Sequence, residues 1–250
     1  MGLNKSNGHM YPFIDETFNT IIGECEHNCK YCYMKVHEQS QLRLNHKAFN
    51  TDLGAGKFIF VGSHTDVFAD NVPEKWILDT FDTCERYRNK YMFHTKNPKR
   101  FYEIIKDRPF NDNYVLCGTI ETNRYIPLIM NNAPTPKERA KYMNKCATEL
   151  ETANYVTIEP IMDFDLSEMV ELVKSCKPKL VSIGADSKRH GLPEPSIPKT
   201  IKLIEEINKF SKVYLKKNLR RILNDAYCQS WAKNLHSKSK SPSKEPAALF

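Results

Sequence analysis

The chain has 250 residues, of which 40% are hydrophobic and 27% are charged, and its formal net charge is +7. This composition is typical of a globular protein and excludes a collagen, a coiled coil or a wholly disordered chain. It contains no run of about 18 apolar residues and its first residues lack the apolar core of a signal peptide, so we expect neither a membrane span nor a secretory leader.

Short apolar segments alternate with amphipathic segments along the chain. Strands are predicted over residues 18–23, 57–62, 91–94, 114–119, 155–158 and 180–184, with a short seventh at 213–215. Helices are predicted over residues 73–88, 98–106, 136–149, 166–176 and 198–210, where apolar side chains recur every three or four residues. This alternation is typical of βα units and a parallel sheet.

We therefore predict an α/β fold, and the number of units favours a partial (βα)6 barrel over the eight units of a full TIM barrel. A doubly wound open sheet is the alternative, although no G-x-G-x-x-G motif follows the first strand. The expected divisions are a flexible N-terminus at 1–12, the barrel at 13–218, a basic helix at 219–236 and a disordered tail at 237–250.

The net charge is concentrated at the C-terminal end. Nine basic residues follow residue 211 and only two acidic residues oppose them, so the preceding part of the chain is neutral. Four of these cations, Lys216, Lys217, Arg220 and Arg221, lie closest to the last predicted strand. Cations beside a site are suited to neutralising phosphates, which indicates a nucleotide or nucleic acid as one substrate class.

Polar side chains follow nearly every predicted strand. They include Glu24, Ser63, Thr65, Asp66, Lys96, Thr119, Glu121, Glu159, Asp186, Lys216, Lys217 and Asn218. The carboxyl ends of parallel barrel strands meet at one rim. Charges that converge there need a ligand to offset their desolvation, so the pattern predicts a binding site at this rim.

Three of the eight cysteines, Cys25, Cys29 and Cys32, are spaced C-x3-C-x2-C directly after the first predicted strand. Thiolates are suitable ligands for an iron–sulfur cluster, and three of them leave one iron of a [4Fe–4S] cluster open. That iron is able to take the amino and carboxylate groups of S-adenosylmethionine (SAM). A zinc site of three cysteines and one histidine, from His27, His37 or His46, is the alternative. The other five cysteines are expected to be buried and structural in a cytoplasmic protein.

The cysteine motif has an aromatic residue, Tyr31, directly before its last cysteine. In this form it resembles the signature of the radical SAM superfamily. Further segments resemble phage-associated three-Cys-motif radical SAM proteins of unassigned reaction, over about residues 13–218: FVGSHTDVF, FHTKNPKRF, CGTIETNR, TIEPIMDFD and VSIGADSKRHGLPEP. The Ser-x-Thr-Asp and Thr-Lys pieces are similar, more distantly, to the spore photoproduct lyases, a DNA-repair family of the superfamily. One difference is GSHTD at 62–66, where the superfamily usually has Gly-Gly-Glu.

The resemblance implies a [4Fe–4S] cluster on the three cysteines and SAM as cofactor. It places Tyr31 near the adenine and Ser63 and Lys96 at the methionyl end. Thr65 and Asp66 are further candidates for the methionyl end, and a turn that caps the following helix is the alternative for this segment. Lys96 offers a cation to the SAM carboxylate.

Thr119 and Glu121 suit the ribose hydroxyls, with an ion pair between Glu121 and Arg124 as the alternative for the carboxylate. Lys96, Glu159 and Asp186 are the candidate catalytic residues. The two carboxylates are expected to face the substrate, or else to be buried ion-pair partners.

The expected activity is therefore reductive cleavage of SAM to a 5′-deoxyadenosyl radical, which abstracts a hydrogen from a substrate. The expected partners are SAM, an electron donor of the flavodoxin or ferredoxin type and a nucleotide or nucleic acid, without a membrane. Two alternatives remain: a radical SAM enzyme that acts on a peptide or a small molecule with a partner protein, and a non-enzymatic, metal-stabilised nucleic-acid-binding module.

Overall fold

The main sheet consists of strands in the order β1-β2-β5-β6-β7-β8-β9-β10 in a computed structural model that describes residues 2–6, 11–109 and 111–238. The strands are β1 (Leu3–Lys5), β2 (Glu16–Phe18), β5 (Phe58–Val61), β6 (Lys90–Thr95), β7 (Tyr114–Thr119), β8 (Ala153–Ile158), β9 (Pro178–Ile183) and β10 (Lys212–Leu215). Neighbouring strands are parallel from β2 to β10, and β1 joins β2 in antiparallel register. A separate two-stranded ladder joins β3 (Ile21–Ile22) to β4 (Arg43–Leu44).

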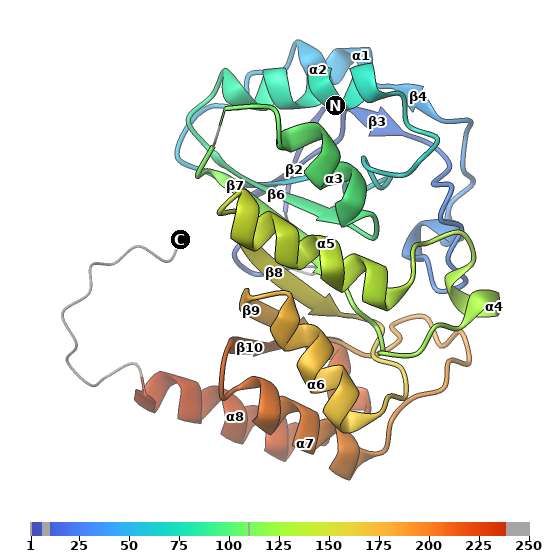
Figure 1. Ribbon diagram of the computed structural model, residues 1–250, viewed down its shortest axis with the longest axis vertical. Helices are drawn as coiled ribbons and strands as arrows, with labels where there is room; N and C mark the ends of the chain where they lie inside the picture. The colour runs from blue at the N-terminus through green and yellow to red at the C-terminus, as the bar shows by residue number, and fades with distance from the viewer. Residues whose placement is uncertain (1, 7–10, 110, 239–250) are drawn as a thin grey trace.

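Helices connect successive parallel strands. They are α1 (His46–Phe49), α2 (Glu74–Glu85), α3 (Pro98–Ile105), α4 (Pro127–Met130), α5 (Pro136–Glu149), α6 (Leu166–Ser175), α7 (Ile197–Ile207) and α8 (Asp225–Lys238), with 3-10 turns η1 (Tyr33–Val36) and η2 (Lys217–Arg221). Figure 1 shows α3, α5, α6 and α7 following one another along the same face of the sheet. Strand order follows chain order without reversal, which differs from the doubly wound alternative. The prediction of an α/β fold with a parallel sheet is confirmed.

The helices begin where the sequence supplies suitable caps. The Asn97 side chain accepts a hydrogen bond from the backbone of Arg100 at the start of α3, and Pro98 follows in the first turn. Thr135 caps α5 in the same way through Glu138, before Pro136. A polar cap followed by proline satisfies orphan amide groups and preorganises the first turn, so the beginnings of these helices are encoded locally.

The alternation of side chains along the strands places them in two separate hydrophobic cores. In β5, Ile59 and Val61 pack in the larger core with the helices, while Phe58 and Phe60 face the opposite side. A smaller core on that opposite side contains Tyr11, which comes from the segment before β2. Because successive strand residues point to opposite faces, the helices close one face and the N-terminal segment covers part of the other.

Two boundaries differ from the sequence prediction near the N-terminus. The first parallel strand is Glu16–Phe18 rather than 18–23, because the chain bends after Phe18 and Ile21–Ile22 pairs with β4 instead. The bend ends at Gly23, which has φ of +110°, and a Cβ there would lie 2.5 Å from the carbonyl oxygen of Gln41. Residues 3–5, expected to be flexible, form β1 because they pair with β2.

The C-terminal elements also differ in detail. The basic helix expected at 219–236 is divided into η2 and α8, and residues 222–224 separate the two. The proposed tail at 237–250 lies almost wholly outside the described residues, as do residues 7–10 of the proposed flexible N-terminus.

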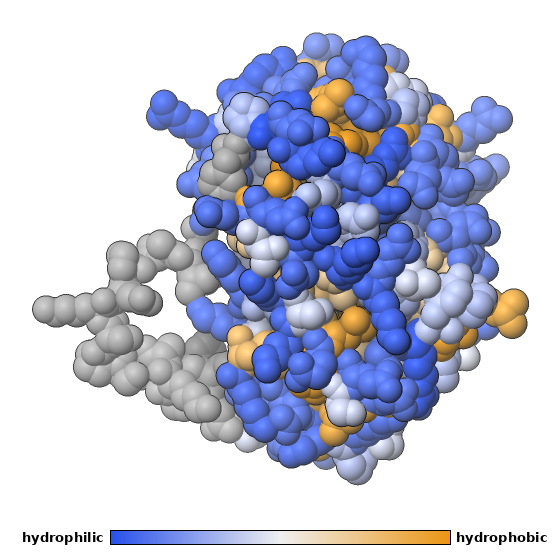
Figure 2. Space-filling view, in the orientation of Figure 1, coloured by the Kyte–Doolittle hydropathy of each residue, from blue (hydrophilic) through white to orange (hydrophobic). Residues whose placement is uncertain are grey.

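The face of the molecule that carries the helices is mainly hydrophilic (Figure 2). Among the described helices, none combines the length and apolar character that are needed to cross a bilayer.

The buried side chain of Asn154 joins β8 to two helices. The side-chain nitrogen of Asn154 donates to the carbonyl oxygens of Met143 at 2.6 Å and Cys176 at 2.8 Å. We expect Asn154→Ala to lower the free energy of unfolding by about 1–3 kcal/mol, because it leaves buried carbonyl groups without a donor. Denaturant unfolding measures the change.

Asn144→Ala is the matched control for this prediction. Asn144 makes a similar bond to the Ser175 carbonyl at 2.7 Å, but on the exposed surface. Its loss is expected to cost about 0.5 kcal/mol or less. Equal destabilisation by the two variants would contradict the assigned role of Asn154.

Candidate functional site

A cavity of about 1070 Å³ opens at the carboxyl ends of the parallel strands. It contains the three clustered cysteines and most of the polar residues that the sequence predicted. The predicted residues on its wall are Cys25, Cys29, Cys32, Tyr31, Ser63, Thr65, Asp66, Lys96, Thr119, Glu159 and Asp186. The structure therefore brings together, at one cavity, residues that are separated by up to about 160 positions in the chain.

The cysteine loop forms one wall of this cavity. Its first turn is closed by a hydrogen bond of 3.1 Å from the Asn28 amide to the Cys25 carbonyl, and Asn28 adopts φ of +47°. Asparagine tolerates this left-handed conformation better than most residues. A second turn joins the Cys32 amide to the Cys29 carbonyl at 3.1 Å. These two turns direct the three cysteines into the cavity from a segment of only eight residues.

The three thiols are free, and burial disfavours the thiolate form of two of them. Burial, together with the nearby Asp66 carboxylate, raises the pKa of Cys25 to about 12. Burial also raises the pKa of Cys29. A bound metal favours the thiolate and offsets this cost, so these groups are chemically suited to a positively charged metal centre.

The donor set fits an iron–sulfur cluster in chemical type: it offers three free sulfur ligands that line a common cavity. Among the described residues, no three His, Cys, Asp or Glu side chains are grouped so as to hold a single metal ion. His27, which the sequence offered as a zinc ligand, directs Nε2 to Asp66 at 2.9 Å.

The residues after β5 are largely engaged within the protein. Ser63 exchanges hydrogen bonds with the Asn19 side chain at 3.0 and 3.2 Å. The Thr65 hydroxyl donates to the carbonyl of Gly23 at 2.6 Å. Asp66 forms a local turn, because one of its oxygens accepts from the Phe68 amide at 3.0 Å, but this turn does not cap α2, whose N-cap is Pro73. The segment therefore ties β5 to the beginning of the cysteine loop.

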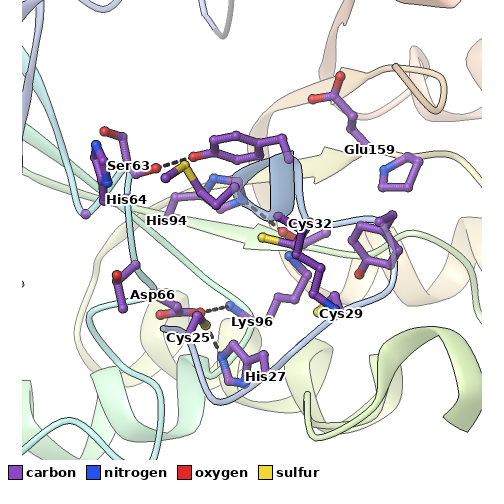
Figure 3. A pocket seen from close by; sticks show the side chains of 18 of the residues that line it. Cys25, His27, Cys29, Cys32, Ser63, His64, Asp66, His94, Lys96 and Glu159 are labelled. Atoms are coloured by element: carbon purple, nitrogen blue, oxygen red, sulfur yellow. Dashed lines mark hydrogen bonds and ion pairs between the residues drawn. The ribbon is translucent and has the colours of Figure 1, made fainter. Parts of the chain in front are cut away.

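Lys96 lies at the centre of the cavity wall. Its ammonium is 5.3 Å from the centroid of the Tyr31 ring, on the cysteine loop. Figure 3 shows Lys96 near Asp66 and Cys25, and Glu159 on the other side of the cavity. Neither an ion pair nor a side-chain hydrogen bond of Lys96 is found in the described part of the chain, so its ammonium is placed to meet an anionic group.

Glu121 does not line the cavity, which differs from its expected position beside a ribose. Its carboxylate is fully buried, with one oxygen 2.7 Å from Nη1 of the equally buried Arg139. The other oxygen accepts a hydrogen bond from the Tyr31 hydroxyl. Arg124, the expected partner, instead pairs with Asp163 and Asp165. Glu121 therefore anchors Tyr31 from behind the cavity wall.

Thr119 does line the cavity, beside a histidine that the sequence reasoning did not select. Nε2 of His94 lies 2.8 Å from the Thr119 hydroxyl. Burial, reinforced by the charge of Lys96, lowers the pKa of His94 to about 3. The imidazole is therefore neutral at physiological pH. The alternation of side chains along β6 is the sequence signal that could have identified His94, because His94 lies on the face of the strand opposite to Phe93.

Glu159 lies at the opposite end of the cavity as part of an ion pair. Its carboxylate is bound by the Lys216 ammonium and by Nδ2 of Asn218, the latter at 2.6 Å. Lys216 is itself buried and lies 4.4 Å from the centroid of the Tyr11 ring. A Cβ on Gly184 would lie 2.6 Å from Oε1 of Glu159, so the close packing of this group requires glycine.

Asp186 is also paired. Its carboxylate accepts hydrogen bonds from the backbone amides of Lys188 and His190, and Nδ1 of His190 lies 2.7 Å away. Burial raises the pKa of Asp186, but the bonds with His190 outweigh it, so the net shift is downward. Both carboxylates thus line the cavity, Glu159 in an ion pair with Lys216 and Asp186 in hydrogen bonds with His190.

The cluster of cations at the C-terminal end is largely neutralised. Arg221 pairs with Glu194, and Arg220 lies 3.5 Å from Asp225. With Lys216 bound to Glu159, Lys217 is the member of the four that lines the cavity without an ion pair in the described residues. The sequence indicated the charge but not these partners, which come from distant segments.

These features define an α/β fold with a thiol-lined cavity at the carboxyl ends of its parallel strands. Residues 10–187 match the family described as protein of unknown function (DUF5131), and the chain belongs to that family. Comparison with curated proteins finds no match.

Two solved structures share this fold. One is a cysteine-to-serine mutant of spore photoproduct lyase, with a TM-score of 0.63 and 13% identity, covering 86% of this chain and 79% of that chain. The other is spore photoproduct lyase in complex with a dinucleoside spore photoproduct, with a TM-score of 0.53 and 13% identity, covering 83% and 64%. At this identity the likeness is one of fold.

The depressed pKa of His94 predicts a pH dependence of stability. The unfolded chain takes up a proton at His94 below its ordinary pKa of 6.5, whereas the folded chain does not until about pH 3. Acidification through this window therefore favours unfolding, with a limiting slope of about 1.4 kcal/mol per pH unit. We expect His94→Gln to reduce the loss of stability between pH 7 and pH 5, as measured by denaturant unfolding. Parallel stability curves for the two proteins would contradict the assignment.

Proposed function

We propose that this protein is a radical SAM enzyme in which Cys25, Cys29 and Cys32 hold a [4Fe–4S] cluster. The observation that carries the proposal is the position of the three free thiols, on one short loop that follows β3 and faces a cavity large enough for a cofactor and a substrate. When bound, the cluster and SAM would supply the electron and the 5′-deoxyadenosyl radical that removes a hydrogen from the substrate.

The chain's own residues would bind and orient SAM beside the loop. Lys96 provides a cation for the carboxylate, and Ser63 provides a hydroxyl close to the end of β5. Tyr31 offers an aromatic surface that Glu121 and Arg139 hold from behind. Thr119 is placed for a ribose hydroxyl, and its bond to His94 fixes its orientation.

The architecture that we propose is the partial (βα)6 barrel, with residues 13–218 as the catalytic body and 219–236 as a basic C-terminal extension. Parallel strands in chain order with helices along one face support this proposal. We also propose that the chain is related to the phage-associated three-Cys-motif radical SAM proteins that its sequence resembles. The proposed function also includes an electron donor of the flavodoxin or ferredoxin type. The proposed location is cytoplasmic, which suits eight free cysteines.

A nucleotide or nucleic acid is the proposed substrate class. A structural neighbour was solved with a dinucleoside, and Lys217 and Lys188 line the cavity at the end away from the cysteine loop. Glu159 and Asp186 complete this end of the cavity and would orient the substrate.

Cluster assembly and SAM cleavage test the central proposal. After anaerobic reconstitution, we expect about four irons per chain and release of 5′-deoxyadenosine from SAM when dithionite is added. Cys29→Ala is expected to abolish both, because one of the three iron ligands is lost. Iron analysis and chromatography of the products provide the measurements.

Cys228→Ala is the matched control, because Cys228 is a buried residue of α8 and does not line the cavity. It should retain iron and SAM cleavage at the level of the unmodified protein. A colourless protein with one zinc and no SAM cleavage would identify the non-enzymatic alternative and refute the proposal.

Binding of short DNA oligonucleotides across a salt series tests the substrate class. We expect affinity to fall as salt rises from about 50 to 200 mM, and Lys217→Ala to lower the slope of log affinity against log salt by about 1. Lys99→Ala, on the outer helix α3, is the control and should leave the slope unchanged. Absent or salt-independent binding would refute the nucleic-acid proposal and favour a peptide or small-molecule substrate.

A further inference from the structure

The carboxylate of Asp66 is bound by other groups of the protein and is not a free ligand for a cofactor. Its Oδ2 atom accepts from Nε2 of His27 at 2.9 Å, from the Thr95 hydroxyl at 3.0 Å and from the Lys96 amide at 2.8 Å. Its Oδ1 atom accepts from the Phe68 amide at 3.0 Å. A carboxylate has about two lone-pair sites on each oxygen, so three donors fully engage Oδ2 and one donor occupies Oδ1. Most of the acceptor capacity of Asp66 is therefore used within the protein, which leaves little for the amino group of SAM.

The charge of Asp66 is maintained by this set of contacts. Burial raises its pKa, but the neighbouring His27 and the hydrogen bonds to His27, Lys96 and Phe68 outweigh burial and hold the pKa well below its usual range. Hydrogen bonds to an ionised acceptor are stronger than those between neutral groups. The carboxylate is therefore a strong connection between β5, β6 and the cysteine loop.

His27 is the member of this connection that belongs to the loop. It lies midway between Cys25 and Cys29, is buried, and points to Asp66 (Figure 3). The other side of the same loop is held by the segment around α4: the Asn132 amide donates to the His27 carbonyl at 3.2 Å, and the Asn132 side chain donates to the Glu26 carbonyl at 3.0 Å. The loop is thus held between the strand ends and the α4 segment by contacts within the protein.

We propose that Asp66 and His27 are positioning residues that hold the cysteine loop in its cluster-binding shape, and that Asp66 does not contact SAM. This inference rests on the proposed function and refines it, because it removes Asp66 from the expected SAM-methionine contacts. Residues that orient the ligands of a metal centre typically change metal retention by about 10- to 100-fold when they are removed.

The test compares His27→Ala and Asp66→Asn with the unmodified protein after anaerobic reconstitution. We expect both variants to release iron to a chelator about 10- to 100-fold faster, and to show an altered electron paramagnetic resonance spectrum of the reduced cluster. His27→Gln, which keeps a side-chain donor, is expected to recover part of the iron retention. His46→Ala, at an exposed histidine of α1, is the matched control and should behave as the unmodified protein.

Two further measurements separate the possible outcomes. Hydrogen exchange of the metal-free proteins should be faster over residues 24–33 in His27→Ala and Asp66→Asn, which tests the positioning role without a cluster. Equilibrium binding of SAM to the reconstituted proteins tests the reassignment of Asp66. Iron retention and exchange like those of the unmodified protein, with loss of SAM binding in Asp66→Asn, would overturn the proposal.

These results also distinguish the inference from the proposed function. If the unmodified protein takes up no cluster, the proposed function fails, and hydrogen exchange still decides whether Asp66 and His27 order the loop. If the unmodified protein binds a cluster and the variants hold it equally well, only the positioning role fails.

Discussion

The two-residue alternation of the parallel strands is the constraint on which the rest of the structure depends. One set of side chains is apolar and packs against the helices, and the other set faces the opposite side. On that second side the residues change along each strand, from apolar groups such as Met92 and Val115 to polar groups such as His94 and Thr119. The carboxyl ends of the strands coincide because the strands are parallel and in register, so the polar groups form a single cavity.

Three carboxylates of the cavity wall each have a basic partner. Glu159 is bound to Lys216, Asp186 to His190 and Asp66 to His27. A buried charge without a partner is costly, so a site that contains several carboxylates needs such pairs. The pairs also join neighbouring strand ends, which gives the rim a defined shape. Lys35, Lys96, Lys188 and Lys217 are the cavity lysines without an ion pair within the described residues.

The cysteine loop combines local and tertiary control. Its two tight turns follow from the C-x3-C-x2-C spacing and from Asn28, which accepts a left-handed conformation. Its orientation depends on residues outside the loop, namely Asp66, Glu121 and Asn132. A loop held at three points keeps its ligands ordered at a smaller entropic cost when a cofactor binds.

The sequence by itself determined the elements that depend on nearest neighbours: the parallel α/β pattern, the capped starts of α3 and α5, and the cysteine spacing. Most of the polar residues that it identified at strand ends line the cavity, because such groups are recognisable from alternation alone. Only the tertiary structure decided the partners. Glu121 binds Arg139 rather than Arg124, Lys216 binds Glu159, and Asp66 accepts hydrogen bonds from three segments. These contacts join residues far apart in the chain, and their strength depends on burial, which no local pattern records.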